Sequence, residues 1–441
     1  MGYITCKFGG SSLADSACLR AAAAIIDANP DRRYIVPSAP GKRDPKDIKV
    51  TDLLYTWQTL VQQGLDPGQP MQLVRERFNQ LAQELSLKVD VQRELDLIAA
   101  ECPSHAEPDY MASRGEYLNG LLLAELLRAT FVDPLELIKF DEEGYLDPVS
   151  YDLMGQALAS PGRYVIPGFY GSTPDGKVKT FSRGGSDITG AIVARATKSR
   201  LYENWTDVSG FRMADPRIVP NAQYISEITY QELRELAYMG ANVLHDEAIF
   251  PVREPGIPVS ILNTRAPDDP GTLIVATREP KTPVCGIAGQ RGFTMINVEK
   301  TLMNRERGFG RRVLSVLEDH GVSFEHMPSS IDTMSIIVKD DELANHGPSV
   351  VKGIQNTCEP DKVYLTSGLA LVATVGQGMA GRIGIAARLT GSCAQAGVNL
   401  RVLDQGSSEN NIIIGVEERD LEKAVLAIHN EFAEVESQGA A

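Results

Sequence analysis

The chain has 441 residues, of which 43% are hydrophobic and 23% charged, and its formal net charge is −15. This length favours two or three domains, and the composition is ordinary for a soluble globular protein. The negative charge argues against a general nucleic-acid or anionic-membrane surface, although a local cluster of Arg and Lys can still bind an anionic substrate. Six scattered cysteines without a CxxC pair, and no apolar run of membrane-spanning length, predict a cytoplasmic protein with reduced thiols.

The N-terminal segment has the pattern of the first strand and helix of an α/β unit. Residues 3–8 have strand composition, Gly9-Gly10-Ser11-Ser12 follows, and an alanine-rich helix is predicted up to about residue 28. Loops at the carboxyl ends of such strands are common ligand-binding sites. Lys7 stands directly before the glycines, so we interpret it as a phosphate contact, with a solvated lysine as the alternative. The segment is not a P-loop, because GxxxxGK[ST] is absent.

A long helical region is predicted from about residue 53 to residue 127. Within it, Ser113-Arg114-Gly115-Glu116-Tyr117 is predicted to begin a helix. On this evidence alone, Glu116 is a first-turn carboxylate that the helix dipole favours. The other predicted features of this part are strands at 34–36, 137–140 and 164–168 and helix breaks near 64–68 and 102–103.

The densest group of functional residue types is Phe181 to Gly190, FSRGGSDITG. Gly184 and Gly185 would let the backbone approach a ligand closely. A cation, a hydroxyl and a carboxylate surround them at Arg183, Ser186 and Asp187, and an apolar helical pattern follows. A helix N-terminus with these groups is typical of a site for an anionic or acidic ligand, and a capped structural turn is the alternative.

The part after this helix contains further turns at strand ends. Thr206 and Asp207 follow a strand at 201–206 and are well placed to contact a ribose or a phosphate. The first domain is expected to end near residue 280, after the Pro- and Asp-rich loop APDDPGT. The other predicted elements are a turn at Asp215-Pro216-Arg217, helices at 229–239 and 246–253, and a strand at 259–262.

The last 160 or so residues contain an internal repeat. A shift of 76 positions (397 − 321) places Gly321-Val322 on Gly397-Val398 and Ile336-Ile337-Val338 on Ile412-Ile413-Ile414. Each copy reads as a β-α-β-β unit, and two copies indicate paired modules rather than a solenoid. Neither copy contains a catalytic His, Cys or paired-carboxylate group, so we interpret this half as binding and regulatory.

Together these stretches resemble the aspartate kinases of the amino acid kinase superfamily. Each motif alone is common in the superfamily, but their order, followed by tandem ACT-like repeats, is specific. The resemblance rests on KFGGSS at 7–12, SRGE at 113–116, FSRGGSD at 181–187, WTDV at 205–208, ADPRIV at 214–219 and QGSSEN at 405–410.

The resemblance implies an α/β fold, in which an amino acid kinase-like α/β/α sandwich over residues 1–280 precedes a regulatory region over 281–441. That region would hold two β-α-β-β modules of the ACT, ferredoxin-like type, at about 285–360 and 361–441. The implied activity is phosphorylation of the β-carboxylate of L-aspartate by ATP with Mg²⁺, the first step toward lysine, threonine and methionine. No metal held by the protein alone is expected.

The resemblance also assigns roles to residues. Lys7 would neutralise charge on the transferring phosphoryl group, with Asp187 orienting Lys7 or the metal. Arg183 would clamp the α-carboxylate of the substrate, and Glu116 would receive its α-ammonium. The remaining residues implied for the substrate are Ser38, Thr51 and Ser186, and those implied for the nucleotide are Phe8, Gly9, Gly10, Thr206, Asp207, Arg212, Arg217, Asn242 and Val243.

Two departures from the family pattern bear on these roles. Asn242 and Asp246 stand where the family commonly has Lys and Pro, which removes one nucleotide-phosphate contact. The loop from Gly41 to Val50 is longer than usual, which leaves the alignment of Thr51 open by a few residues. Two other functions therefore stay open as alternatives: an amino-acid sensor with weak catalysis, and a kinase for another amino acid.

The first repeat resembles the effector site of lysine-inhibited relatives. A lysine effector would suit its two carboxylates, because ammonium groups need anionic partners; threonine is the alternative effector, and an ordinary polar turn is the alternative structure. Pairing of the ACT-like repeats between chains would give a homodimer or a homotetramer. The residues implied for the effector are Met303, Phe309, Ser323, Phe324, Glu325, Ser329, Ser330 and Asp332.

Overall fold

The structure is a computed structural model that describes residues 2–105, 107–182, 184–241, 244 and 246–433. The chain divides into two compact units. The first comprises residues 1–211, 224–230 and 242–278, and the second comprises 212–223, 231–241 and 279–441. The final segment of the second unit begins at residue 279, close to the boundary expected at 280. Two earlier segments, 212–223 and 231–241, also belong to that unit.

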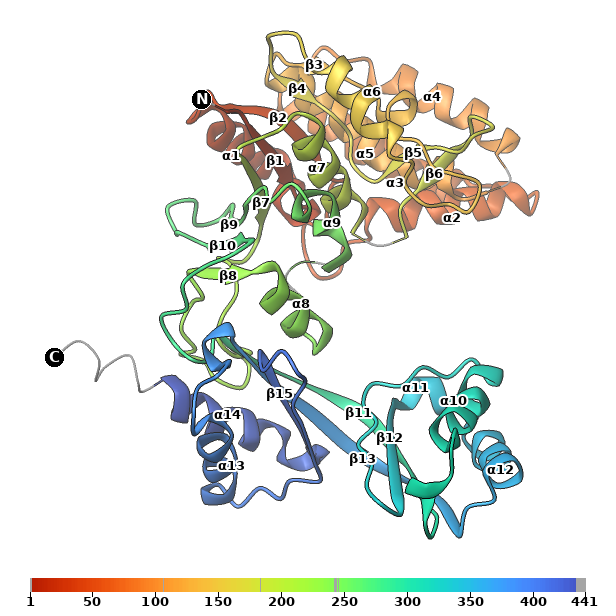
Figure 1. Cartoon of the computed structure of the whole chain (residues 1–441). Helices are drawn as coiled ribbons and strands as arrows, with labels where there is room; N and C mark the ends of the chain where they lie inside the picture. The colour runs from red at the N-terminus through yellow and green to blue at the C-terminus, as the bar shows by residue number, and fades with distance from the viewer. Residues whose placement is uncertain (1, 106, 183, 242–243, 245, 434–441) are drawn as a thin grey trace, which may run out of the picture. The chain divides into compact units, whose positions relative to one another are not determined.

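An eight-stranded sheet forms the centre of the first unit (Figure 1). All of its pairings are parallel except that of β9 with β10. The sheet order is β3 (Thr130–Phe131), β4 (Tyr164–Val165), β2 (Arg32–Pro37), β1 (Ile4–Phe8), β7 (Leu201–Thr206), β9 (Val259–Asn263), β10 (Thr272–Val275) and β8 (Glu227–Thr229).

Helices cover both faces of this sheet because alternate residues of its central strands are apolar on both sides. Ile4, Cys6 and Phe8 of β1 belong to a core shared with α1 (Ser16–Asp27), α2 (Val50–Gln62), α3 (Gly68–Glu84), α4 (Val91–Glu101) and α5 (Asp109–Leu126). Tyr34 and Val36 of β2 belong to the opposite core, with α6 (Val149–Ala157) and α7 (Gly185–Ala196), and α9 (Phe250–Arg253) packs on α7. The predicted α/β/α sandwich is confirmed.

Short elements complete this unit. The strand predicted at 137–140 is wrong: a 3-10 turn stands before it, and Lys139 and Phe140 form only isolated bridges. The short edge strand β3 was not predicted, since two residues give no periodic pattern. The remaining elements are the hairpin β5 (Tyr170–Ser172) and β6 (Val178–Thr180) and the 3-10 helices η1 (Gly10–Leu13), η2 (Cys102–Ser104), η3 (Pro134–Glu136) and η4 (Asp246–Ile249).

The second unit contains a five-stranded antiparallel sheet in which two strands are long. β11 (Gly286–Glu299) and β13 (Lys362–Val375) pair along nearly their whole length. Their two ends serve two different cores, and Figure 1 shows α10 and α12 beside one end and α13 and α14 beside the other. The sheet order is β12 (Thr333–Lys339), β11, β13, β15 (Asn411–Glu417) and β14 (Val402–Asp404).

This pairing places the first module inside the second. Val284 and Ile287, at the start of the region, pack in the core of the second module, whereas Ile296 and Val298 pack in that of the first. Two consecutive modules at 285–360 and 361–441 therefore do not describe the packing. The helices of this unit are α8 (Tyr230–Tyr238), α10 (Phe309–Asp319), α11 (Asp340–Leu343), α12 (Gly347–Cys358), α13 (Ile385–Gln395) and α14 (Leu421–Ala433), with 3-10 helices η5 (Met303–Arg305), η6 (Gln377–Met379) and η7 (Glu418–Asp420).

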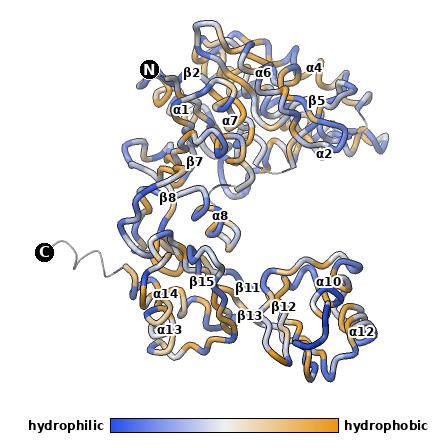
Figure 2. Tube along the Cα trace, viewed as in Figure 1, coloured by the Kyte–Doolittle hydropathy of each residue, from blue (hydrophilic) through white to orange (hydrophobic). Residues whose placement is uncertain are grey.

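Apolar residues are distributed along the whole chain in both units (Figure 2). None of the helices among the described residues is long and apolar enough to cross a membrane. The segment at 212–223 groups with the second unit because Met213, Ala214, Val219 and Ala222 lie in the core of the second module.

Candidate active site

Lys7 and Asp187, the two residues predicted to be catalytic, form an ion pair at the carboxyl end of β1. The Lys7 ammonium lies 2.6 Å from Oδ1 of Asp187, and both side chains are largely shielded from solvent. Asp187 is in the first turn of α7, where the helix dipole stabilises a carboxylate. The structure therefore brings together the two residues predicted to be catalytic, from distant positions in the first unit's sequence.

The glycines before α7 have a structural requirement. Gly184 caps the helix in the left-handed conformation, with φ of +57°. A Cβ on Gly185 would collide with Phe169. Ser186 is buried, and a Cβ on Gly168 would stand 2.6 Å from its hydroxyl, so two glycine turns meet here. Arg183, the predicted carboxylate clamp, lies outside the described residues.

Two residues of β7 that sequence reasoning missed also contact Asp187. The Asn204 side-chain amide donates to Asp187 Oδ1 at 2.8 Å, and the Tyr202 hydroxyl donates to the Asp187 carbonyl at 3.0 Å. Burial and the nearby Asp187 charge raise the pKa of Tyr202, so its hydroxyl stays protonated as a donor. A strand-end Asn carries no local signal, because its partner lies 17 residues away.

The loop after β1 departs from the prediction in two respects. Phe8 is fully buried and stacks on Trp205 with ring centroids 6.0 Å apart, so its side chain belongs to the core rather than to a nucleotide site. The Gly9 amide donates to the Trp205 carbonyl at 2.9 Å, so this amide is used within the sheet and the prediction that it cradles a phosphate is wrong. Gly10 allows a close approach instead: a Cβ there would meet the Ala39 carbonyl at 2.9 Å.

Glu116 is not a first-turn carboxylate, because α5 begins at Asp109. Its side chain is buried, and its Oε2 atom has no hydrogen-bond partner among the residues that the structure describes. Burial raises the pKa of Glu116 to about 8, although the Ala39 amide and the charge of Lys7 favour the ionised form. A buried acceptor without a partner is costly in a folded protein, so this oxygen is a candidate for a ligand contact.

The long loop before α2 is anchored by a buried arginine. The Arg77 guanidinium pairs with Asp47 at 2.8 Å and donates to the carbonyls of Ala14 and Gly41, each at 2.6 Å. Its anchoring role was not predicted, because Arg77 reads as one polar position of an amphipathic helix. The loop leads to Thr51 at the second position of α2.

Ser38, the other predicted substrate hydroxyl, lies at the end of β2 beside the Lys7 loop. Its amide donates to the Phe8 carbonyl at 3.0 Å, and its carbonyl accepts from the Asn119 side chain at 2.7 Å. The backbone at Ser38 is thus fixed by β1 on one side and by α5 on the other.

The predicted nucleotide residues do not all fall in one unit. Thr206 ends β7, and its carbonyl accepts hydrogen bonds from Thr264 in the first unit. Asp207 is exposed beside it. Arg212 and Arg217 belong to the second unit, where Arg212 donates to the Ala222 carbonyl at 3.1 Å and Arg217 pairs with Asp215 at 2.6 Å. Asn242 and Val243 lie outside the described residues.

Comparison with known proteins agrees with this arrangement. Residues 3–263 match the model of the amino acid kinase family, and residues 372–432 match that of an ACT domain. Aspartokinase 3 of Bacillus subtilis (strain 168) is 41% identical over 446 residues, which cover 97% of this chain and 98% of the relative. The chain belongs to the amino acid kinase family and is an aspartate kinase.

Two solved aspartate kinases share this fold over nearly their full length. The crystal structure of Clostridium acetobutylicum aspartate kinase has a TM-score of 0.91 and 48% identity, covering 98% of this chain and 100% of that one. Escherichia coli aspartokinase III in complex with aspartate and ADP has a TM-score of 0.77 and 26% identity, with coverage of 98% and 100%. Its complex with lysine and aspartate has a TM-score of 0.76 and 26% identity, with coverage of 98% and 99%.

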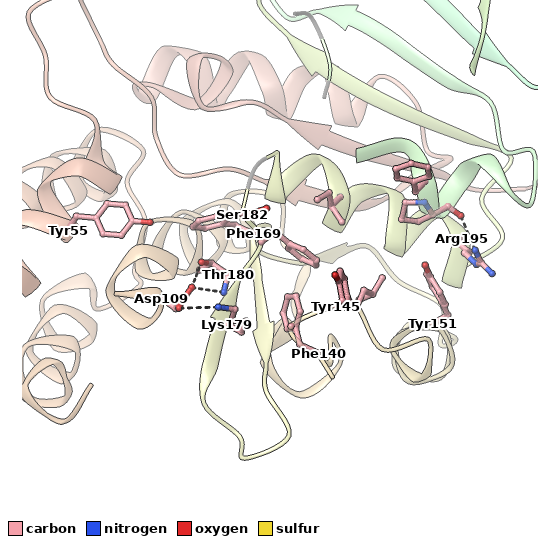
Figure 3. Close-up of a pocket in the computed structure, with 16 residues that line it drawn as sticks. Tyr55, Asp109, Phe140, Tyr145, Tyr151, Phe169, Lys179, Thr180, Ser182 and Arg195 are labelled. Atoms are coloured by element: carbon pink, nitrogen blue, oxygen red, sulfur yellow. Dashed lines mark hydrogen bonds and ion pairs between the residues drawn. The ribbon is translucent and has the colours of Figure 1, made fainter. Parts of the chain in front are cut away.

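A cavity of about 980 Å³ opens in the kinase unit beside the segment from Lys179 to Ser182. Phe181 and Ser182, which directly precede Arg183 in sequence, line it, and so does Phe169. Figure 3 shows Phe169 and Ser182 close together in this lining. None of the described residues predicted to bind substrate or nucleotide is in its lining. Asp109 holds one end of the cavity together, accepting from the Thr180 amide at 2.9 Å and facing Lys179 at 3.9 Å (Figure 3).

The residues predicted for the effector fall into two groups in the first regulatory module. Met303 and Phe309 are buried in its core, and the Lys300 ammonium lies 5.4 Å from the Phe309 ring centre. Met303 is 5% exposed and Phe309 is 3% exposed, so their part in an effector site stays a prediction.

The polar members of the predicted effector site lie in turns around the same module. Glu325 pairs with Lys339 at 3.3 Å, and its side chain is only 6% exposed. The Asp332 carboxylate accepts from the Leu302 amide at 2.7 Å. The residues at 323–325 form no strand. The remaining predicted effector residues, Ser323, Phe324, Ser329 and Ser330, are exposed.

Proposed function

We propose that this aspartate kinase transfers the γ-phosphoryl group of ATP to the β-carboxylate of L-aspartate, giving 4-phospho-L-aspartate. The observation that carries the proposal is the juxtaposition of a buried lysine and a buried carboxylate. Lys7 is held by Asp187 at a strand end, and its charge acts on Glu116, whose Oε2 lacks a partner among the described residues. Lys7 and Glu116 together suit an amino acid substrate. Its ammonium can bind Glu116, and its reacting carboxylate can lie near Lys7.

The chemistry requires positioning more than proton transfer. A β-carboxylate is already ionised near neutral pH, so it attacks the γ-phosphorus without a general base. Catalysis then consists of in-line alignment and neutralisation of charge on the transferring group. Lys7 supplies that neutralisation, Glu116 receives the α-ammonium, and Arg183 clamps the α-carboxylate. The hydroxyls of Ser38, Thr51 and Ser186 complete the substrate contacts.

Nucleotide binding is proposed at the carboxyl ends of β1 and β7, with Gly10, Thr206 and Asp207. The E. coli relative that binds ADP supports this use of ATP. Among the described residues, no group of three or more His, Cys, Asp or Glu side chains could hold a metal ion. The Mg²⁺ that accompanies ATP fits nonetheless, because phosphate oxygens provide most of its ligands and one or two carboxylates suffice. Asp187 and Asp207 offer those carboxylates, and the bound ion would neutralise phosphate charge.

Regulation by an amino acid is proposed for the ACT modules, with lysine as the effector. The complex of E. coli aspartokinase III with lysine and aspartate supports this choice. Glu325 already holds a lysine side chain, that of Lys339, at a nearly buried position. An effector ammonium can compete for the same carboxylate. Threonine, which has one ammonium rather than two, is the alternative. Pairing of the modules between chains would make the enzyme a homodimer or a homotetramer, and the effector would favour a state of low activity.

The test is ADP release from MgATP with L-aspartate, with and without L-lysine or L-threonine. Release that depends on aspartate and falls on addition of lysine is expected. Release that ignores both effectors would keep the kinase and refute the proposed regulation. An absence of aspartate-dependent release would refute the reaction itself, and the same assay with other amino acids would then identify the acceptor.

A further inference from the structure

We propose that Asn204 is a positioning residue for the phosphoryl transfer, acting on Lys7 through Asp187. This role rests on the proposed function, because it matters only if Lys7 contacts the transferring group. The carrying observation is that one carboxylate oxygen, Asp187 Oδ1, accepts both the Lys7 ammonium at 2.6 Å and the Asn204 amide at 2.8 Å.

Strand register produces this arrangement. β1 and β7 are parallel neighbours, and Lys7 stands directly opposite Asn204 in their register. Paired residues of neighbouring strands point to the same face, so both side chains point toward α7. The carboxylate of Asp187 enters from the N-terminus of α7 and meets both donors. Asn204 is only 3% exposed, so its amide is shielded from water that could replace this bond.

A second residue on the same face of β7 holds the backbone of Asp187. The Tyr202 hydroxyl donates to the Asp187 carbonyl at 3.0 Å. It reaches this carbonyl past Gly190, where a Cβ would stand 2.5 Å from the hydroxyl oxygen. Tyr202 fixes the first turn of α7, and Asn204 fixes the rotamer of the carboxylate on that turn. The carboxylate therefore has one orientation before any substrate binds.

This orientation has a consequence for Lys7. A carboxylate that is free to rotate would follow the ammonium, and Lys7 would lose its fixed direction toward the phosphoryl group. The amide of Asn204 also shares the charge of Oδ1, which weakens the hold of Asp187 on the ammonium. Lys7 then keeps its place and remains able to interact with phosphoryl oxygens as negative charge develops. Asn204 should therefore affect turnover, while aspartate binding through Glu116 and Arg183 should change little.

The alternative is that Asn204 only satisfies a buried polar position. A matched control separates the two roles. Thr5 lies two residues before Lys7 on the same face of β1, is fully buried, and shares a 2.8 Å hydrogen bond with Ser199 rather than with Asp187. Thr5→Val removes a buried hydrogen bond from the same strand face without touching the Lys7–Asp187 pair.

The experiment compares kcat and KM values for aspartate and for MgATP in the full-length protein. Asn204→Ala is expected to lower kcat by about 10- to 100-fold and to change the KM for aspartate by less than about twofold. Thr5→Val is expected to keep kcat within about twofold. Asn204→Leu, which has a similar shape but no donor, replaces the alanine variant if circular dichroism shows that the latter is unfolded.

A double-mutant cycle supplies the decisive readout. In an Asp187→Asn background, Asn204→Ala should lower kcat by less than about threefold, because the carboxylate that it positions is gone. Equal losses in both backgrounds, an unchanged kcat, or the same loss in Thr5→Val would each overturn the role. If the unaltered enzyme showed no aspartate-dependent ADP release, the proposed function and this role would both fail. If the enzyme were active and Asn204→Ala left kcat unchanged, only the role of Asn204 would be refuted.

Discussion

The buried carboxyl of Glu116 leads to a prediction about how aspartate binding depends on pH. With a pKa of about 8, only about a tenth of the unliganded enzyme carries an ionised Glu116 at pH 7. In the proposed complex the α-ammonium of aspartate binds the ionised form of Glu116, so binding should expel the proton. Between pH 6 and 8 the affinity for aspartate should therefore rise by up to about tenfold for each pH unit.

The perturbation is Glu116→Gln, which keeps the shape of the side chain and removes its charge and titration. At pH 8 and above, the loss of a charge-assisted hydrogen bond should weaken aspartate binding by about 10- to 150-fold. At pH 6 the unaltered enzyme has itself lost about 100-fold in affinity, so the two proteins should converge there. The positive charges of Lys7 and Arg114 are present in both proteins, so their effect on aspartate binding cancels from the comparison.

Isothermal titration calorimetry in buffers of different ionisation enthalpy measures the expelled proton directly. Aspartate binding at pH 7 should release about 0.9 proton from the unaltered enzyme and almost none from Glu116→Gln. Proton release that is equal in the two proteins, or an affinity that is flat from pH 6 to 8, would refute the assignment of the ammonium to Glu116.

Three further changes test other parts of the molecule. Lys7→Ala should lower kcat by about 100- to 1000-fold while lysine still binds by calorimetry, and an unchanged kcat would remove its role. Glu325→Ala should raise the lysine concentration for half-inhibition by at least about tenfold, whereas Glu318→Ala, an exposed carboxylate of α10, should leave it unchanged. Arg77→Ala removes the hydrogen bonds to Asp47 and to the carbonyls of Ala14 and Gly41, although Arg43 still pairs with Asp47, so urea unfolding should show a loss of about 2–3 kcal/mol; a loss below about 1 kcal/mol would contradict the anchoring role.

The stability of the unliganded protein provides an independent check on Glu116. Its folded-state pKa of about 8 lies above the ordinary value of 4.5, so the folded state binds this proton more tightly than the unfolded state. The resulting stabilisation is fully present below pH 4.5 and is lost as pH rises through 8, a change of roughly 5 kcal/mol at most. Glu116→Gln lacks this loss, so its advantage in unfolding free energy should grow between pH 6 and 9.

Sequence reasoning succeeded where the signal was local. Strand, glycine loop and helix near Lys7, and the glycine turn before Asp187, each follow from a few adjacent residues. The family's motif order then gave the fold class, which the structure confirms. The error at Phe8 was avoidable: neighbouring residues of a strand point to opposite faces, so Lys7 and Phe8 could not both face a nucleotide.

The other misses came from partners that are distant in sequence. The helix that carries Glu116 begins four residues earlier than predicted, at Asp109 rather than at Ser113. Glu116 therefore lies in the interior of the helix rather than in an exposed first turn. Its side chain is buried there, and this burial raises its pKa. Asn204 gave no signal because its contact with Asp187 depends on a strand register and a helix start that no local pattern contains.

The two faces of β1 and β7 explain why the register can be this strict. On one face, Lys7 meets Asn204 and the carboxylate of α7. On the other, Glu203 accepts from the Trp205 indole at 2.8 Å and from the Arg32 guanidinium at 2.8 Å, within the apolar core. A slip of one residue would bury Lys7 in that core and turn Phe8 toward the phosphoryl group, and both faces would lose their partners. The register that excludes this error also sets the position of the Lys7 ammonium, so the packing of the core and the geometry of the proposed reaction are specified by the same contacts.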